Sequence, residues 1–334
     1  MTPVRWKRLV AGGVAAALGA ACTQTGGDHG LTAGEKFEAG YLAGAAEQSR
    51  ATAHRFELEW RTEHSGELAW LNDQFTYILH GEQHGDRYSM LMDFTEMVAD
   101  HTPHRPDGPS PGELEELDTT FIEIVGDGDV LFVRAPVLAM MAESFSMGQL
   151  PDDDPVAVLR DGWGRVDLSL DDPGTVADLQ EELGGAPAGD PGELLRLVAS
   201  ADDVRESGDD RIRDVTAHGL VGAVSLGDLQ EHGGVDLRGS LADMTGRAGG
   251  DLGALWNEVR ADTLPVEVWI DDDGYVRRFF YTVDLPSVLA SHEVPVEREG
   301  PVTSVSAELF DYGDESIDIR FPTDWVDITV WFLS

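Results

Sequence analysis

In the first part of the chain, apolar residues follow first the spacing of a helix and then that of a strand. Residues 34–50 repeat apolar side chains at the spacing of one helix face, which predicts a short helix. Residues 54–62 (HRFELEWRT) then alternate apolar and charged side chains, which is typical of a half-buried strand. Phe56, Leu58 and Trp60 share one face of that strand.

Two hairpins are predicted next, separated by a proline-rich loop at residues 101–113. Residues 74–97 form the first, in which two strands are joined through Gly81 to Asp86. Residues 119–136 form the second and turn at Gly126 to Asp129, because glycine and aspartate adopt the backbone conformations of a tight turn. The second strand of the first hairpin places these side chains on one face: Tyr88, Met90, Met92 and Phe94.

The middle of the chain favours helices and the remainder favours strands. Helices are predicted over residues 137–150, 175–183 and 191–201, around a short strand at 162–170. Strands are predicted over residues 211–226, 266–270, 275–285, 303–313 and 316–322, interrupted by one helix at 251–260. Many antiparallel strands around a helical block predict an α+β fold in one domain, with helices on one face of a sheet.

The start of the chain carries a targeting pattern. Three basic residues precede an uncharged segment of 13 residues, which is too short to span a bilayer and ends in small residues before Cys22. Residues 1–21 are therefore predicted to be an export signal, residues 22–34 a flexible tether and residues 35–334 a single domain. Cys22, the only cysteine, resembles the lipid-modified cysteine of bacterial lipoproteins; the alternative is an ordinary cleaved signal that leaves a cysteine near its end.

The excess of acidic residues argues against some partners. The signal holds three of the 23 basic residues and none of the 63 acidic ones, so the mature chain has 20 basic residues and a formal charge of −43. A field of that sign repels nucleic acid and anionic lipid headgroups. A hydrated acidic surface explains the charge without a particular partner, which leaves a diacylglyceryl group on Cys22 as the expected membrane anchor.

Three consecutive aspartates, Asp271 to Asp273, precede Gly274 between two apolar runs and raise the question of a cation site. A calcium-binding EF-hand loop needs ligands at alternating positions and a glutamate at the twelfth, which this stretch lacks. Adjacent side chains of a strand or turn also diverge. A tight hairpin turn is therefore predicted, with the glycine at positive φ.

Other motifs for catalysis or metal binding do not stand out. The pairs His80/His84 and His101/His104 lack a nearby third ligand and are predicted to be solvated. The sequence contains no nucleophile elbow, phosphate-binding loop or zinc-protease motif, which weighs against an enzyme. We therefore expect no catalytic residue, no cofactor and no metal.

The apolar faces of the predicted elements are the remaining candidates for a binding site. The two strand faces and the predicted helix at 137–150 are rich in methionine and aromatic residues, and methionine adapts to irregular apolar shapes. They are candidates to line a ligand cavity, and an ordinary core is the alternative at each position. The candidate lining residues are Phe56, Leu58, Trp60, Tyr88, Met90, Met92, Met140, Met141 and Phe145.

A series of motifs in residues 120–322 resembles a known family. The motif residues are, in order, Leu195, Val204 and Gly208; Gly222, Val224 and Leu226; the hairpin PVEVWIDDDGYVRR (residues 265–278); and Asp311, Tyr312 and Gly313. Their order is similar to that in the actinobacterial LppX/LprG-type lipoproteins, relatives of the LolA-like lipoprotein carriers. The chain departs from the family pattern at Leu220 and Ser225.

The resemblance implies a strongly curved antiparallel sheet, a half-barrel, with helices packed on its concave face and an apolar cavity between them for acyl chains. It implies a non-enzymatic protein, lipid-anchored on the extracytoplasmic face of the cell membrane. Such a protein carries or presents a lipid or lipoglycan and has an envelope transporter as a partner. The alternative is a structural or regulatory envelope lipoprotein that binds a protein partner.

We expect Cys22→Ser to release the protein from the membrane, because the substitution removes the only thiol that can carry the lipid. Fractionation of cells that express the wild type or the variant measures this release. Equal retention of both proteins in the membrane fraction contradicts the lipid anchor.

Overall fold

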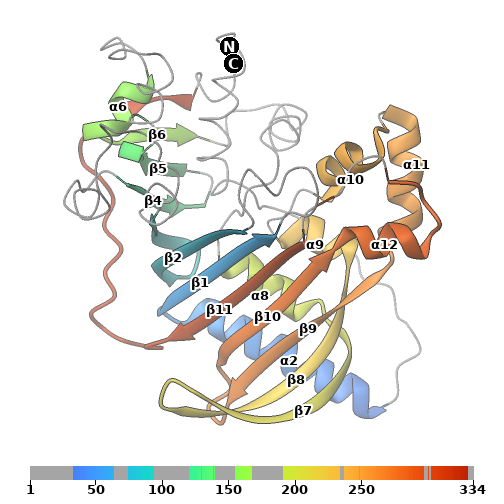
Figure 1. Cartoon of the computed structure of the whole chain (residues 1–334). Coiled ribbons are helices and arrows are strands. Elements are labelled where there is room, and N and C mark those ends of the chain that lie inside the picture. Colours follow the sequence, from blue (N-terminus) through green and yellow to red (C-terminus); the bar gives the residue numbers. More distant parts are fainter. Residues whose placement is uncertain are drawn as a thin grey trace.

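One open sheet of twelve strands organises the chain (Figure 1). The computed structural model describes residues 33–63, 74–93, 120–128, 130–137, 139, 155–167, 191–233, 237–247, 249–296, 300 and 302–329. The strands are β1 (His54–Glu63), β2 (Gln74–His84), β3 (Arg87–Asp93), β4 (Phe121–Asp127), β5 (Val130–Arg134), β6 (Gly164–Asp167), β7 (Asp202–Ile212), β8 (Val215–Ser225), β9 (Thr263–Asp271), β10 (Val276–Asp284), β11 (Val302–Phe310) and β12 (Val326–Asp327).

The order of the strands leaves two edges. It runs β12-β6-β5-β4-β3-β2-β1-β11-β10-β9-β8-β7, so within the described ranges β7 and β12 each have one neighbour. The two-residue contact between β12 and β6 is parallel, whereas every other pair is antiparallel. β1 and β11, far apart in sequence, lie side by side in the middle of the sheet.

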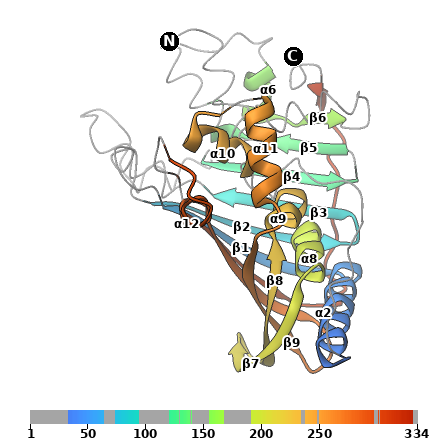
Figure 2. The same cartoon turned by 90° about the vertical axis from the view of Figure 1, so that its right-hand side faces the viewer.

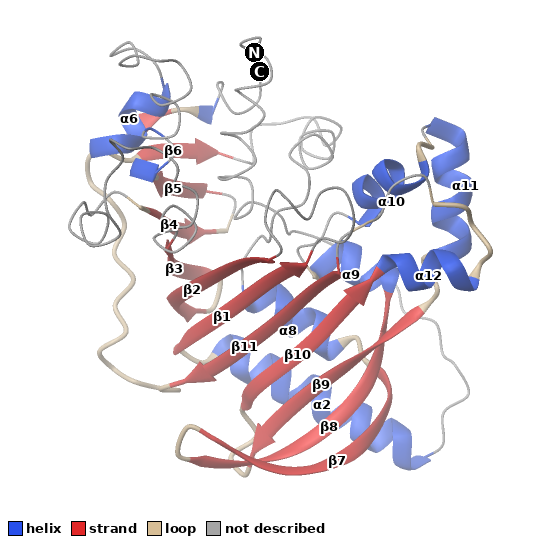
Figure 3. Ribbon diagram, in the orientation of Figure 1, coloured by secondary structure: helices blue, strands red, loops and turns tan. Residues whose placement is uncertain are grey.

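Helices cover the concave side of the sheet. They are α2 (Ala33–Ala51), α6 (Pro155–Asp161), α8 (Pro191–Ala199), α9 (Leu226–His232), α10 (Leu237–Thr245), α11 (Gly249–Val259) and α12 (Leu285–Ser291). The strands curve around α2 and α8, and α9 to α12 gather at one end of the sheet (Figures 2 and 3). α2 contacts α8 and strands β2, β7 and β10. The predicted α+β fold, with a curved sheet and helices on its concave face, is therefore confirmed.

An apolar row crosses eight neighbouring strands on the concave side, which we call the inner face. Cross-strand register joins its members directly, and none is more than 6% exposed. The row consists of Leu220, Val268, Phe279, Ala307, Leu58, Leu79, Met92 and Ile122. Side chains of α2 and α8, such as Leu42 and Leu195, belong to the same hydrophobic cluster. Removal of this face from water is the main force that holds helices to sheet.

Two aromatic rings of the inner face lie over glycines of the neighbouring strand. Phe56 pairs with Gly81 and Tyr88 with Gly126 in the register of the sheet. A Cβ atom on Gly81 would lie 2.3 Å from the Phe56 ring, and one on Gly126 would lie 2.4 Å from the Tyr88 ring. The prediction that Gly81 begins the turn of the first hairpin is therefore wrong. β2 continues to His84 because the glycine accommodates a ring.

Several predicted elements agree with the structure and two do not. The helix at 34–50 and the strand at 54–62 are confirmed as α2 and β1. Residues 316–322 were predicted to be a strand, but they pair with no strand of the sheet. The strand predicted at 211–226 is in fact the end of β7, a turn and β8. β7 begins nine residues before it, so the motif residues Val204 and Gly208 lie in a strand.

Other expectations fall outside the described residues. They include the export signal, the helix at 175–183, and the helix at 137–150 apart from Val137 and Ala139. α2 begins at Ala33, so the last two residues of the predicted tether are helical. The division into signal, tether and single domain stays a prediction.

We expect Gly81→Ala to lower the free energy of unfolding by about 2 kcal/mol, because the new methyl group overlaps both the Phe56 ring and the backbone carbonyl oxygen of Ser89. Gly44→Ala in α2 is the matched control. Nothing lies within 4 Å of its Cβ position, so a gain of about 0.5–1 kcal/mol is expected from helix propensity. Urea unfolding measures both, and equal effects of the two substitutions would contradict the ring-over-glycine contact.

Candidate functional site

Six of the nine lining candidates lie on the inner face of the sheet. They are Phe56, Leu58 and Trp60 on β1, and Tyr88, Met90 and Met92 on β3. All six are at most 5% exposed and belong to one hydrophobic cluster. These two strands flank β2 in the sheet, so the structure places on one face candidate residues that are 28 or more positions apart in the sequence. Met140, Met141 and Phe145, and the anchor candidate Cys22, lie outside the described residues. Contact between any of the nine and a ligand stays a prediction.

The three aspartates form a hairpin turn, as predicted. Gly274 has φ 84° and donates its backbone N–H to the carbonyl of Asp271, and the N–H of Asp271 bonds to the carbonyl of Tyr275. The side chain of Asp271 is buried, contrary to the exposed position expected in a turn. It accepts backbone N–H groups of Asp273 and Tyr275 at 3.0 and 2.9 Å, and the guanidinium of Arg277 at 2.6 Å. Protein donors therefore surround this carboxylate.

Helix α2 docks on the same turn. Ser49 accepts the backbone N–H of Val276 on its hydroxyl at 2.8 Å, and Gln48 donates to the carbonyl of Asp273 at 3.0 Å. Tyr312 donates its hydroxyl to the carbonyl of Val276 at 2.6 Å, and its ring stacks on Tyr275 at 4.3 Å. Burial raises the pKa of the Tyr312 hydroxyl, so it remains a donor. These contacts fix the helix against the sheet.

A buried histidine packs beside Tyr312 of this cluster. His54 Nδ1 lies 2.8 Å from the carbonyl oxygen of Thr52, and the ring centroid lies 5.1 Å from that of Tyr312. Burial lowers the pKa of His54 to about 4, so the imidazole is neutral at pH 7. Neutral Nδ1–H then donates to the carbonyl, and Nε2 is buried without a hydrogen-bond partner.

The opposite, convex side of the sheet, which we call the outer face, carries charges and a covering segment. Residues 311–325, the strap, connect β11 to β12 along the left of Figure 1. Phe132 and Val125 point outward, yet they are only 9% and 3% exposed. The Phe132 ring lies 6.0 Å from Phe321 and 6.2 Å from Trp325 between ring centroids, so strap residues cover this part of the outer face.

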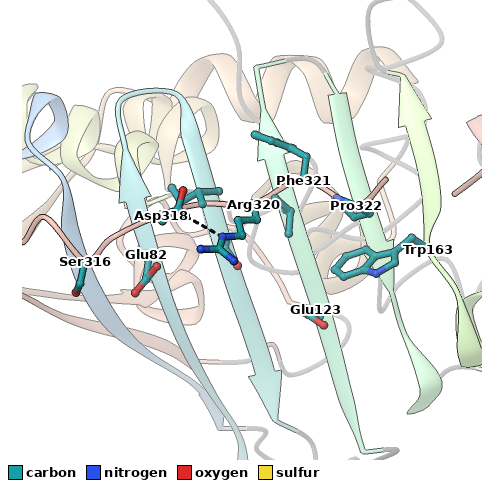
Figure 4. Close-up of a pocket in the computed structure, with 11 residues that line it drawn as sticks. Glu82, Glu123, Trp163, Ser316, Asp318, Arg320, Phe321 and Pro322 are labelled. Carbon is teal, nitrogen blue, oxygen red and sulfur yellow. Dashed lines mark hydrogen bonds and ion pairs between the residues drawn. The ribbon is translucent and has the colours of Figure 1, made fainter. Parts of the chain in front are cut away.

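A cavity of about 440 Å³ lies between the strap and the outer face of β2 to β4 (Figure 4). Its lining residues are Glu82, Ser89, Glu123, Val125, Trp163, Ser316, Asp318, Ile319, Arg320, Phe321 and Pro322. A second hollow of about 330 Å³ shares Glu82, Ser89 and Glu123 with it. The sequence does not indicate this cavity, because the alternation of Ile317, Ile319 and Phe321 predicts a strand.

Comparisons with known proteins find likeness in structure alone. No family model matches the chain, and no curated protein matches it. Among solved structures, LprF from Mycobacterium bovis is similar at 10% identity and a TM-score of 0.40, over 86% of this chain and 98% of that one. Lipoprotein LppX from Mycobacterium tuberculosis is similar at 10% identity and a TM-score of 0.36, over 86% and 100%. A LolA superfamily protein from Nitrosomonas europaea is similar at 11% identity and a TM-score of 0.26, over 84% and 94%.

Metal ligands and membrane-spanning helices are considered within the described residues alone. Within them, no three histidine, cysteine or carboxylate side chains gather in a way that could hold a metal ion. His80 is half-exposed and lies 3.7 Å from Glu57, whereas His101 and His104 fall outside the described ranges. No described helix is both long and apolar enough to cross a membrane.

We expect His54 to make the fold less stable in acid. The unfolded chain takes up a proton near pH 6.5 and the native state only near pH 4, so stability falls by up to about 3 kcal/mol across that window. The difference in unfolding free energy between the wild type and His54→Phe, measured by denaturation from pH 4 to 8, should show this slope.

His218 provides a control of opposite sign. Its two nitrogens lie 2.8 Å from Asp209 and 3.0 Å from Asp272, and these carboxylates raise the pKa of the exposed imidazole. Its contribution is therefore present in acid and is lost as the pH rises through the raised pKa. Parallel curves for the wild type and His54→Phe between pH 4 and 7 contradict the assignment of the acid loss to His54.

Proposed function

We propose that the protein is a lipid-anchored binding protein of the cell envelope. It holds the acyl chains of a lipid or lipoglycan against the inner face of its sheet and carries or presents that lipid outside the cytoplasm. Cys22 is the anchor, and an envelope transporter is the expected partner. The protein performs no catalysis in this proposal.

The single observation that carries the proposal is the extent of the apolar inner face. The apolar row spans eight strands, while the main contacts of α2 with the strands are with β2, β7 and β10. The candidate residues Tyr88, Met90 and Met92 lie on β3, beyond β2 in the sheet order. An apolar face broader than one helix suits an elongated apolar ligand.

The chemistry of these side chains agrees with an acyl chain. Transfer of each CH₂ group from water to an apolar surface is worth about 0.8 kcal/mol, so a chain of ordinary length is held without any specific polar contact. Met90 and Met92 have unbranched, polarizable side chains that can follow an irregular apolar shape. The rings of Phe56 and Tyr88 are fixed over glycines and supply rigid surface beside them.

Native mass spectrometry and photo-crosslinking test the proposal on the mature chain. We expect copurifying lipid in the mass spectrum, its loss after lipid extraction, and its replacement by a fatty acid that carries a diazirine. Crosslinks should map to Trp60, Met90 and Met92 on the inner face. A protein with no copurifying lipid and no uptake of the probe contradicts lipid carriage and favours the role of binding a protein partner.

Neighbouring residues of β3 offer a matched pair of variants. Met92 is 3% exposed on the inner face and Leu91 is 40% exposed on the outer face. We expect Met92→Trp to weaken binding of a fluorescent fatty acid about tenfold by filling the inner face, and Leu91→Trp to leave it unchanged. Circular dichroism checks that both variants fold. Equal loss in both variants contradicts binding at the inner face.

A further inference from the structure

We propose that protonation of His54 releases helix α2 from the inner face, so that acid opens the site proposed above for a lipid. The nature of the ligand rests on the proposed function, whereas the motion of α2 can be measured without one. His54 is the first residue of β1, and only Thr52 and Ala53 separate it from the end of α2. A change at this side chain therefore acts at the junction between the helix and the sheet.

The imidazole of His54 has no place for a second proton while α2 is docked. The residue is 0% exposed, and Nδ1 lies 2.8 Å from the carbonyl oxygen of Thr52, which accepts the single N–H of the neutral ring. A second proton would bind to Nε2, which is buried without a hydrogen-bond partner among the described residues. A buried, charged N–H that lacks an acceptor is costly, so the docked state disfavours the imidazolium.

Other histidines of the protein have the carboxylate that His54 lacks. His80, His218, His232 and His292 lie between 2.6 and 3.7 Å from a carboxylate oxygen. No carboxylate in the described part of the chain makes such a contact with His54. Because a nearby carboxylate stabilises an imidazolium, its absence makes protonation of His54 compete directly with packing.

The groups that face His54 from the sheet bring no unbalanced charge. The ring centroid of Tyr312, which follows β11, lies 5.1 Å from that of His54, and burial raises the pKa of the Tyr312 hydroxyl, so it is neutral. Gln83 pairs with His54 from β2 and is uncharged. The Arg277 guanidinium lies 5.0 Å from the centroid of the Tyr312 ring and is bound to Asp271 at 2.6 Å, so these two charges offset each other. None of these groups compensates a charge on His54.

The end of α2 contributes carbonyl groups and an ion pair. Burial lowers the pKa of His54 to about 4, although the carbonyls of Thr52 and Ser49 favour the protonated imidazole. Glu47 and Arg50, the charged residues of the last turn of α2, are bound to each other at 3.0 Å. The docked helix therefore acts on the histidine mainly by excluding water.

Release of α2 is linked to the uptake of one proton. With α2 away from the sheet the imidazole is hydrated and titrates near its ordinary pKa of 6.5, whereas its pKa is about 4 when α2 is docked. Because the open state binds the proton more tightly, the ratio of open to docked protein rises by up to about tenfold per pH unit as the pH falls from 6.5 to 4. Above pH 6.5 this drive to open is lost.

α2 moves more easily than the strand that carries the histidine. β1 is paired along its length with β2 on one side and β11 on the other. α2 is held to the β9–β10 hairpin by hydrogen bonds of Ser49 and Gln48. The buried apolar side chains of its described part are Leu42, Ala45 and Ala46, and the two alanines remove little surface from water. α2 lies on the concave side of the sheet (Figure 2), so its release uncovers part of the inner face.

The distance between two spin labels measures the release of α2 directly. The experiment uses the mature chain with Cys22→Ser, and places the labels at Gly44→Cys on α2 and Leu91→Cys on the outer face of β3. Nothing lies within 4 Å of the Cβ position of Gly44, and Leu91 is 40% exposed, so both positions have space for a label. We expect a second, longer distance, and its ratio to the docked distance should rise about twentyfold from pH 7 to pH 5.

His54→Phe and His54→Gln remove the titrating group and should abolish this pH response, and either variant suffices if the other does not fold. Ser49→Ala removes a hydrogen bond between α2 and β10, and should raise the open fraction about fivefold at every pH without changing its pH dependence. His218→Gln is the matched control, because it removes an exposed histidine and should leave the response unchanged.

Three results would overturn the proposal. The first is the same pH response in the His54 variants as in the wild type. The second is the absence of a longer distance between pH 4 and 8, even in Ser49→Ala. The third is a single broad distribution of distances in acid, which would mean global unfolding instead of the release of one helix.

Dissociation of a fluorescent diacylglycerol, which does not ionise in this range, tests the consequence for the ligand. It should be about twentyfold faster at pH 5 than at pH 7 in the wild type, and equal at both in His54→Phe. A protein whose labels separate in acid but which never binds the probe contradicts lipid carriage and supports the release of α2. A protein that binds the probe while its labels keep one distance contradicts the release of α2 alone.

Discussion

The apolar row on the inner face is the constraint on which the rest of the structure depends. Strand side chains alternate between faces, so a row that is apolar on one side fixes which residues meet water on the other. Glu57 and Arg278, one residue away from members of the row, accordingly form outer-face ion pairs with Arg213 and Glu308. The row is buried against α2 and α8. The outer face is more polar, and the strap covers only part of it.

The residues that carry the family resemblance hold the sheet to its helix. Asp271, Gly274 and Arg277 of the hairpin motif make one turn, in which the glycine supplies positive φ and the arginine binds the buried carboxylate. Tyr312 of the last motif binds the same hairpin through its hydroxyl. The motif therefore marks how β9, β10 and α2 are joined. It contains no information on the ligand, which explains why the sequence could suggest a lipid carrier and could not name the lipid.

Much of the fold could be predicted because alternation is strong where one face is buried. β1, β10 and β11 alternate clearly and were predicted nearly to their ends. β7 was missed over most of its length because an edge strand with nine exposed positions has no apolar face to reveal it. For residues 316–322 the error is the reverse, because a strand was predicted where there is none. Ile317, Ile319 and Phe321 alternate like strand residues, but no strand of the sheet pairs with them. α9 and α12 are too short for a helical period, and only their caps, Ser225 and Asp284, mark them.

The candidate sites differ in how far the sequence could predict them. The inner-face candidates follow from the alternation of apolar and polar residues along single strands. The cavity under the strap depends on Trp163 and Arg320, which are 157 residues apart, and no local pattern relates them.

The strands β2, β3 and β4 present side chains both to the inner face and to the cavity under the strap, so their register affects both surfaces. A slip by one residue would exchange Met92 for Leu91 and Ile122 for Glu123, and would turn charges inward. Apolar burial alone resists such a slip only through the summed cost of many contacts. The rings of Phe56 and Tyr88 add a discrete restraint, because each fits only where the partner strand has a glycine, at Gly81 and Gly126. In a slipped register His80 or Glu82 would face Phe56, and the ring would have no space. The two glycines therefore reinforce the register that places one set of side chains on the inner face and the other at the outer cavity.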